Sequence, residues 1–299
     1  MKIRQILLMS VFAAIASTLI FSSAFAEETA KLKALIIDGQ NNHNWRETTP
    51  VLKKDLEDTG RFTVDVATSP EHGQDMSQFK PDFAAYDVIV MNYNGDDWPE
   101  ETKKAFEEYM KNGGGMVAFH AADNSFPKWE EYNKMIAVGG WGGRNKASGP
   151  YLYWKDGKQV VDYETNGTGG NHGAQHEFLI EVRDPEHPIM KGMPLKFRHC
   201  RDELYEQLRG PAENVTILAT AWADPKQWGD GRHEPQLMVI SYGKGRVFHI
   251  AMGHAGIQCK SVSFIAPFVR GTEWAATGEV TIPVPEDMPG EDAPVLRLP

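Results

Sequence analysis

Histidines at the ends of expected strands are the residues of this chain that could support chemistry. His120 comes directly after the apolar run 116–119, and His254 follows Gly253 at the end of the run 246–252. In an open α/β sheet, ligands bind at the carboxyl ends of the strands, and imidazole can gain or lose a proton near neutral pH. We therefore predict that His120 and His254 are catalytic. A hydrogen-bonded core histidine is the alternative for His120.

Other polar and aromatic residues at chain reversals are predicted to line the same crevice and bind the substrate. Aromatic rings can stack on sugar rings, although packing is the alternative for each of them. A loop whose asparagines make turn hydrogen bonds is the alternative for the segment 41–45. The predicted substrate-binding residues are His43, Asp96, Trp141, Arg144, His172 and His176, with Trp45, Trp98 and Trp129 as further aromatic candidates.

A carboxylate near the histidines could act as a general base. In the segment 199–205, Asp202 is predicted to cap a short helix, which leaves Glu203 free to point elsewhere. Glu203 is then a catalytic base if it lies near the imidazoles, and a solvated side chain if it does not. Imidazole and carboxylate also suit Zn²⁺ or a similar divalent cation. The candidate ligands for such an ion are His172, His176, His199 and Glu203.

The spacing of His172 and His176 does not by itself establish a metal site. A step of four residues brings two imidazoles together on a helix, but the glycines of the segment 167–173 argue against a helix there. A glycine-rich loop that folds over a ligand explains both histidines equally well. His187, in a turn, and His249, in the middle of a strand, are predicted to be structural.

Apolar runs that alternate with helical patterns must position these side chains. The runs 33–37 and 86–93 are typical of strands buried on both faces, and Thr49 is predicted to cap a helix that Gly60 ends. This alternation predicts an α/β sheet with right-handed crossovers. The pair Asp156-Gly157 predicts a hairpin turn inserted in the second half. Further strands are expected at 62–67, 176–182, 215–221, 236–242 and 246–252, and helices at 99–112 and 266–277.

The first 26 residues are typical of a secretory signal peptide, with two cations, an apolar stretch and small residues at the cleavage site. We therefore expect export, with the periplasm as the destination. Removal of this segment takes the net charge from −10 to −12. An acidic protein repels nucleic acid and anionic lipid, so a neutral small molecule such as a sugar is the expected partner, with no nucleotide cofactor and no membrane contact after cleavage.

Residues 27–283 are long enough to form one α/β domain, and the proline-rich segment 284–299 is predicted to be an extended tail. The two cysteines, Cys200 and Cys259, could form a disulfide or remain as buried thiols. The sequence leaves both a monomer and a homo-oligomer open.

Several short motifs occur here in the order found in the ThuA-like (trehalose utilisation) family, which this chain resembles over about residues 32–283. The resemblance implies a flavodoxin-like fold similar to that of class I glutamine amidotransferases: a mostly parallel sheet with helices on both faces. His120 then stands where those enzymes place their cysteine, and His254 resembles their catalytic histidine. No Gly-x-Cys-x-Gly motif surrounds His120, so amidotransferase chemistry is not expected. The motifs are 42–43, 120–122, 187–189, 202–205, 243–247 and 253–254.

The resemblance also implies a role in bacterial carbohydrate catabolism, often alongside enzymes that make or cleave 3-keto-glycosides. We expect an enzyme that acts on a glycoside or keto-sugar by abstracting a proton next to a carbonyl, giving isomerisation or elimination. Glu203 would be the base, and His120 and His254 would position or polarise the oxygen. The alternative is a non-catalytic sugar-binding or scaffold protein that has kept the sheet.

Overall fold

The structure is a computed structural model that describes residues 30–298. The expected signal peptide, residues 1–26, lies outside the described residues. Within residues 30–298, no helix has the length and apolar character needed to cross a membrane.

Five parallel strands form the half of the sheet from which His43, His120 and His254 project at the carboxyl ends of strands. Their order is β2, β1, β3, β4, β13, and each neighbouring pair is parallel. The central residues of β1, β3, β4 and β13 are buried on both faces, whereas the edge strand β2 is exposed on one face. The strands are β1 (Leu32–Asp38), β2 (Phe62–Thr68), β3 (Val88–Met91), β4 (Gly115–Phe119) and β13 (Gly245–Ile250).

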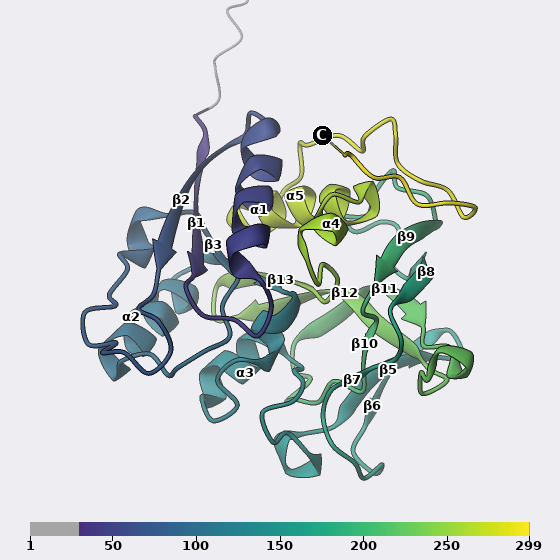
Figure 1. Ribbon diagram of the computed structural model, residues 1–299, viewed down its shortest axis with the longest axis horizontal. Coiled ribbons are helices and arrows are strands. Elements are labelled where there is room, and N and C mark those ends of the chain that lie inside the picture. The colour runs from purple at the N-terminus through teal and green to yellow at the C-terminus, as the bar shows by residue number, and fades with distance from the viewer. Residues whose placement is uncertain (1–29, 299) are drawn as a thin grey trace, which may run out of the picture. The chain divides into compact units, whose positions relative to one another are not determined.

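Helices cover both faces of this half and build two separate cores (Figure 1). Side chains alternate between the faces of a strand, so Ile36 packs in the core under α1 (Trp45–Asp58) and α5 (Val262–Thr277). Its neighbour Ile37 packs in the other core, under α2 (Glu100–Lys111) and α3 (Glu130–Ile136). The predicted α/β fold class, with helices on both faces, is confirmed.

The sheet continues beyond β13 through antiparallel strands in the order β12, β11, β8, β9. The predicted hairpin is present, with Lys155 paired to Lys158 across the Asp156-Gly157 turn. A separate two-stranded sheet pairs Tyr205 with His172. These strands are β12 (His233–Tyr242), β11 (Val215–Trp222), β8 (His176–Val182), β9 (Lys196–Asp202), β5 (Tyr151–Lys155), β6 (Lys158–Asp162), β7 (Asn171–His172) and β10 (Tyr205–Glu206).

Two helices begin earlier than the sequence predicted. Thr49 does not cap α1 but lies inside it, because its hydroxyl donates to Asp38 Oδ2 (2.8 Å) and accepts from Asn92 Nδ2 (2.9 Å) in the core. The helix α5 likewise starts at Val262, four residues before the predicted start, and contains Pro267. The C-terminal ends of α1 and α5 are as predicted, because Gly60 and Gly278, just after them, have positive φ angles of 70° and 84°.

Short helical turns and a docked tail complete the described chain. The tail forms neither helix nor strand after α5, yet it is tied to the domain: Arg198 N–H donates to Gly290 O (2.7 Å) and Val262 N–H donates to Val295 O (2.9 Å). Cys200 and Cys259 are both buried and free, so no disulfide joins them. The short elements are α4 (Gly256–Cys259) and 3-10 helices at Phe83–Ala85, His120–Asn124, Lys146–Ser148 and Pro225–Gln227.

Candidate active site

His120 occupies a strained turn directly after β4. Its φ angle is +44°, in the left-handed region that residues other than glycine rarely adopt, at a cost of about 1–3 kcal/mol. The side chain is 1% exposed, and its Nδ1 lies 2.7 Å from the carbonyl oxygen of Ala251, at the end of β13. A carbonyl oxygen only accepts, so Nδ1 carries the proton and Nε2 presents its lone pair.

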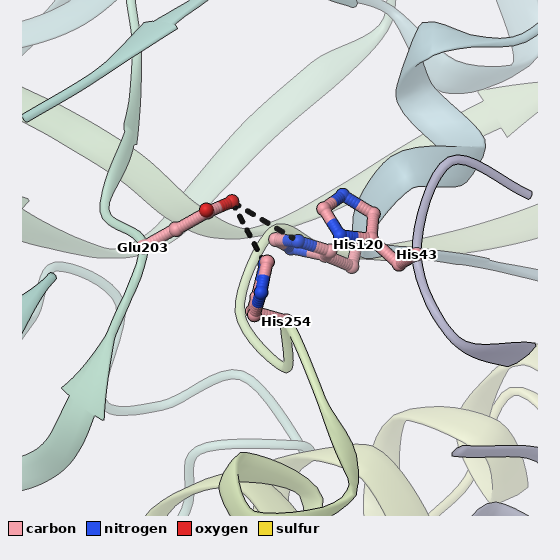
Figure 2. Close-up of side chains that lie close together, drawn as sticks. All are labelled: His43, His120, Glu203 and His254. Atoms are coloured by element: carbon pink, nitrogen blue, oxygen red, sulfur yellow. Dashed lines mark ion pairs between the residues drawn. The ribbon is translucent and has the colours of Figure 1, made fainter. Parts of the chain in front are cut away.

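Glu203 and His254 meet His120 from two other parts of the chain. Glu203 follows β9 and His254 follows β13. Oε2 of Glu203 lies 3.0 Å from His254 Nδ1 and 3.7 Å from His120 Nε2 (Figure 2). The predicted catalytic residues therefore lie together, although β9 and β4 stand far apart in the order of the sheet.

His43, from the loop between β1 and α1, completes the group. Its ring centroid lies 4.7 Å from that of His120 and 4.5 Å from that of His254. Each of the four side chains offers one potential ligand atom within 4.8 Å of the others. We call His43, His120, Glu203 and His254 the open cluster, because two of its members, His43 and Glu203, line a pocket.

The pocket has a volume of about 350 Å³ and combines carboxamides, aromatic rings and titratable groups. His172 Nε2 lies 3.7 Å from Oε1 of Glu203, so the two carboxylate oxygens face different neighbours. The Trp141 and Tyr205 rings lie 4.7 Å apart. A second hollow adjoins the pocket at Asn42 and Asn94 and is also lined by Trp45. The pocket lining is Asn42, His43, Asn94, Asn124, Trp141, Gly142, His172, Glu203 and Tyr205.

Burial and neighbouring charges give the members of the open cluster different pKa values. Burial, reinforced by the two neighbouring imidazoles, lowers the pKa of His43 to about 3, and burial also lowers the pKa of His120. Burial opposes the charge of Glu203, but His254, His120 and His172 outweigh it and hold its pKa below the ordinary value. The Glu203 carboxylate in turn raises the pKa of His254. Near neutral pH, Glu203 is thus anionic while His43 and His120 are neutral.

Asp202 and His199 form a second histidine–carboxylate pair, which we call the sealed pair. His199 Nε2 lies 2.9 Å from Asp202 Oδ2, and its Nδ1 lies 2.7 Å from Ser263 Oγ. Both side chains are fully buried. Although burial alone would lower it, the pKa of His199 rises to about 9 because of its hydrogen bonds to Asp202 and Cys200. His199 therefore has no free nitrogen for a metal, contrary to its place among the predicted ligands.

The sequence predicted that Asp202 caps a short helix. This prediction is wrong, because strand β10 follows Asp202 and no helix begins there. The Asp202 carboxylate accepts N–H hydrogen bonds from Gly253 (2.7 Å), His254 (3.2 Å) and Glu203 (2.8 Å). These bonds tie the end of β9 to the turn after β13. Asp202 thus positions both Glu203 and His254.

Three of the predicted substrate-binding residues, Asp96, Arg144 and His176, do not line the pocket. Asp96 is held by Gly73 N–H (2.6 Å) and His72 Nδ1 (2.8 Å) in a neighbouring loop. Arg144 is buried and donates to backbone carbonyl oxygens, including those of Asn124 and Gly140, so it braces the loop that carries Trp141. A bulge after His176 breaks the alternation of β8, and Nδ1 of His176 bonds to Ala174 O (2.7 Å).

The remaining predicted residues divide between the pocket and the core. Trp141 and His172 line the pocket, whereas Trp98 and Trp129 are buried in the aromatic core beside α2. His249 is fully buried, with Nδ1 at 3.0 Å from Ile136 O, as expected of a structural histidine. The predicted metal ligands His172, His176, His199 and Glu203 are not brought together, since only Glu203 belongs to the open cluster.

Sequence reasoning did not select Tyr205, Asn94 or Asn124 as site residues. Tyr205 stacks on the His120 ring at 4.2 Å and its hydroxyl lies 3.1 Å from His43 Nε2. A step of two residues separates it from Glu203, a spacing that puts two side chains on one face of an extended chain. Asn94 follows β3 and Asn124 ends the turn after β4, so both stand at carboxyl ends of strands, where His120 was found.

A family model described as trehalose utilisation, ThuA, matches residues 33–275. The chain belongs to the ThuA family. A solved structure described as a ThuA-like protein from Parabacteroides merdae is 51% identical, covers 90% of this chain and 98% of its own, and superposes with a TM-score of 0.87. A second ThuA-like structure, from Bacteroides uniformis, is 22% identical, covers 85% and 94%, and has a TM-score of 0.55, which supports the fold alone. A search of the curated proteins finds no match.

Proposed function

We propose that this ThuA protein is an exported enzyme of carbohydrate catabolism that abstracts a proton next to a carbonyl group of a glycoside or keto-sugar. The observation that carries the proposal is the position of Glu203. Its Oε2 faces His120 and His254, while its Oε1 faces His172 on the pocket side. A carboxylate with one oxygen directed toward a pocket can take a proton from a bound substrate.

The histidines supply the other requirement of this chemistry, which is stabilisation of the oxygen. When Glu203 removes a proton from the carbon next to a carbonyl, the electron pair moves onto the carbonyl oxygen. The raised pKa of His254 makes its protonated form a donor to that oxygen. Once it has donated, His254 can take the proton of the adjacent sugar hydroxyl, while neutral His120, buried behind the pocket, faces Glu203 Oε2 at 3.7 Å and positions it. Return of the proton to the neighbouring carbon gives isomerisation, and loss of a leaving group gives elimination.

The pocket lining supports a carbohydrate as the substrate class. Side-chain amides of Asn42, Asn94 and Asn124 can both donate to and accept from hydroxyl groups, and the Trp141 ring offers an apolar face to a sugar ring. The family description, trehalose utilisation, points to the same class. The acidic net charge of −10 disfavours phosphorylated sugars.

To test the proposal, the protein is incubated in deuterated water with a panel of glycosides and their 3-keto forms. Mass spectrometry then measures deuterium uptake and the formation of product. We expect deuterium next to the carbonyl and a converted product with at least one member. Glu203→Gln should lower the rate by about 10²–10⁴-fold. Glu177→Gln, an exposed change on β8, is the matched control. Calorimetric binding of a glycoside without exchange of any proton would instead favour the sugar-binding or scaffold alternative.

A further inference from the structure

The open cluster contains buried nitrogen atoms that have no hydrogen-bond partner. Nε2 of His120 and Nδ1 of His254 are both buried and unpartnered among residues 30–298. His254 Nδ1 lies only 3.0 Å from Glu203 Oε2, yet the two do not have hydrogen-bond geometry. Native proteins pair most buried polar atoms, so two unpartnered nitrogens that converge beside a carboxylate are candidate ligands for a cation.

We propose that His43, His120, Glu203 and His254 bind one divalent transition-metal cation, with Zn²⁺ as the best match. Three imidazoles and one carboxylate suit Zn²⁺, Co²⁺, Ni²⁺ or Fe²⁺, whereas Mg²⁺ and Ca²⁺ prefer oxygen ligands throughout. This inference deepens the proposed function, because it supplies a stronger electrophile at the same pocket. The binding of the cation does not depend on which sugar is the substrate.

The distances within the cluster fit a common ion. Ligand atoms about 2.0–2.2 Å from a tetrahedral Zn²⁺ lie about 3.3 Å from one another. Oε2 of Glu203 is 3.0 Å from His254 Nδ1 and 3.7 Å from His120 Nε2, which bracket that value. All four potential ligand atoms lie within 4.8 Å of one another, so small side-chain shifts would complete the site.

The surroundings of the cluster resemble those of metal ligands. A ligating histidine usually donates its other ring N–H to a carbonyl or carboxylate, which fixes the ring and the nitrogen that faces the metal. His120 does this through Nδ1 to Ala251 O at 2.7 Å. Asp202 holds the backbone N–H groups of both Glu203 and His254, so these two ligands are positioned before an ion binds.

A cation at this point would change the role of His254 in the proposed reaction. With His254 bound to the metal, its ligating nitrogen would carry no proton. The cation would instead polarise the carbonyl oxygen of the sugar by taking it as a fifth ligand. Oε1 of Glu203 still faces His172 and the pocket, while Oε2 binds the ion. Only His43 and Glu203 among the four ligands line the pocket, so a substrate would reach the cation from their side.

The experiment measures metal binding by the full chain in the absence of substrate. Protein stripped with a chelator is titrated with Co²⁺, followed by visible absorption, and then with Zn²⁺ in competition, with metal content checked by mass spectrometry. We expect one ion per chain. His43→Ala and His254→Ala should each weaken binding by more than about tenfold. His176→Ala is the matched control, because His176 lies outside the cluster, and should bind as the unchanged protein does.

Circular dichroism checks that each variant is folded. If a histidine variant does not fold, metal binding is measured with Glu203→Gln in its place. Absence of bound Co²⁺ and Zn²⁺ in the unchanged protein would overturn the proposal, as would a loss of binding in His176→Ala equal to that in His43→Ala. Because the readout is binding alone, a protein that binds one ion through the cluster but converts no sugar would contradict the proposed function and leave the metal site supported.

Discussion

The open cluster and the sealed pair are built from the same kinds of side chain, and they differ in how completely their polar atoms are bonded. In the sealed pair, both nitrogens of His199 and both oxygens of Asp202 have partners. In the open cluster, His120 Nε2 and His254 Nδ1 have no hydrogen-bond partner in the described part of the chain. Both groups are largely buried, so burial alone does not separate them. The saturated hydrogen bonds of the sealed pair fit a structural role, whereas the unpartnered nitrogens of the open cluster converge beside a carboxylate and a pocket and can bind a ligand.

The two groups are also connected, because Asp202 and Glu203 are neighbours in sequence. The Asp202 carboxylate, at the last residue of β9, ties strands together, and the Glu203 carboxylate faces the histidines and the pocket. The comparison therefore predicts that loss of the first carboxylate weakens the fold, whereas loss of the second removes function.

The largest effect on stability is expected from Asp202→Ala. It leaves the His199 imidazolium buried without its partner and removes the acceptor for Gly253 and His254, which should lower the free energy of unfolding by about 3–5 kcal/mol. Glu203→Gln should change it by less than about 1 kcal/mol. Urea unfolding of both variants measures the difference. Equal losses would contradict the distinction between the two groups.

A carboxylate oxygen that is buried with neither the hydrogen bonds of the sealed pair nor the histidines of the open cluster should favour the protonated, neutral form of its group. Oδ2 of Asp55, on α1, is buried and has no hydrogen-bond partner among residues 30–298, and burial together with Asp58 raises the pKa of Asp55 to about 7. The folded state then binds this proton more tightly than the unfolded chain, so the contribution to stability is greatest below about pH 4 and is lost as pH rises to about 7.

Asp55→Asn should remove the loss of stability that ionisation of Asp55 causes as pH rises. At pH 8 we expect it to raise the free energy of unfolding by on the order of 2–4 kcal/mol, with little change at pH 4. Thermal unfolding at both pH values tests this, with Asp292→Asn, an exposed change in the tail, as the control. A variant that gains as much at pH 4 as at pH 8 would show that Asp55 is not protonated in the folded protein.

Within the sealed pair, a much smaller loss of stability than that of Asp202→Ala is expected from Ser263→Ala. The change removes the hydroxyl that bonds to His199 Nδ1 at 2.7 Å, but the ion pair with Asp202 remains. We expect a loss of about 1 kcal/mol, measured by urea unfolding. A loss as large as that of Asp202→Ala would mean that the hydroxyl, and not the carboxylate, dominates the stability of the pair.

Features set by local order were predictable from the sequence. The buried strands before Asp38 and His120, the Asp156-Gly157 turn and the glycine stops follow from apolar runs and backbone preferences that act over a few residues. The starts of α1 and α5 were not, because Thr49 bonds to Asp38 and Asn92, which lie in other elements. A hydroxyl that could cap a helix serves equally well in the core, and only distant neighbours decide between the two.

The candidate site divides in the same way. The sequence by itself placed His120 and His254 at strand ends and offered Glu203 as their carboxylate. It placed His43 among the substrate-binding residues and His199 among the candidate metal ligands, and gave no sign that His43 and not His199 joins the group. The tertiary structure decided this, because β9 lies at the far edge of the sheet and its last residues return to the ends of β4 and β13. In this arrangement both nitrogens of His199 are bonded, to Asp202 and Ser263, whereas His120 Nε2 and His254 Nδ1 have no hydrogen-bond partner within residues 30–298.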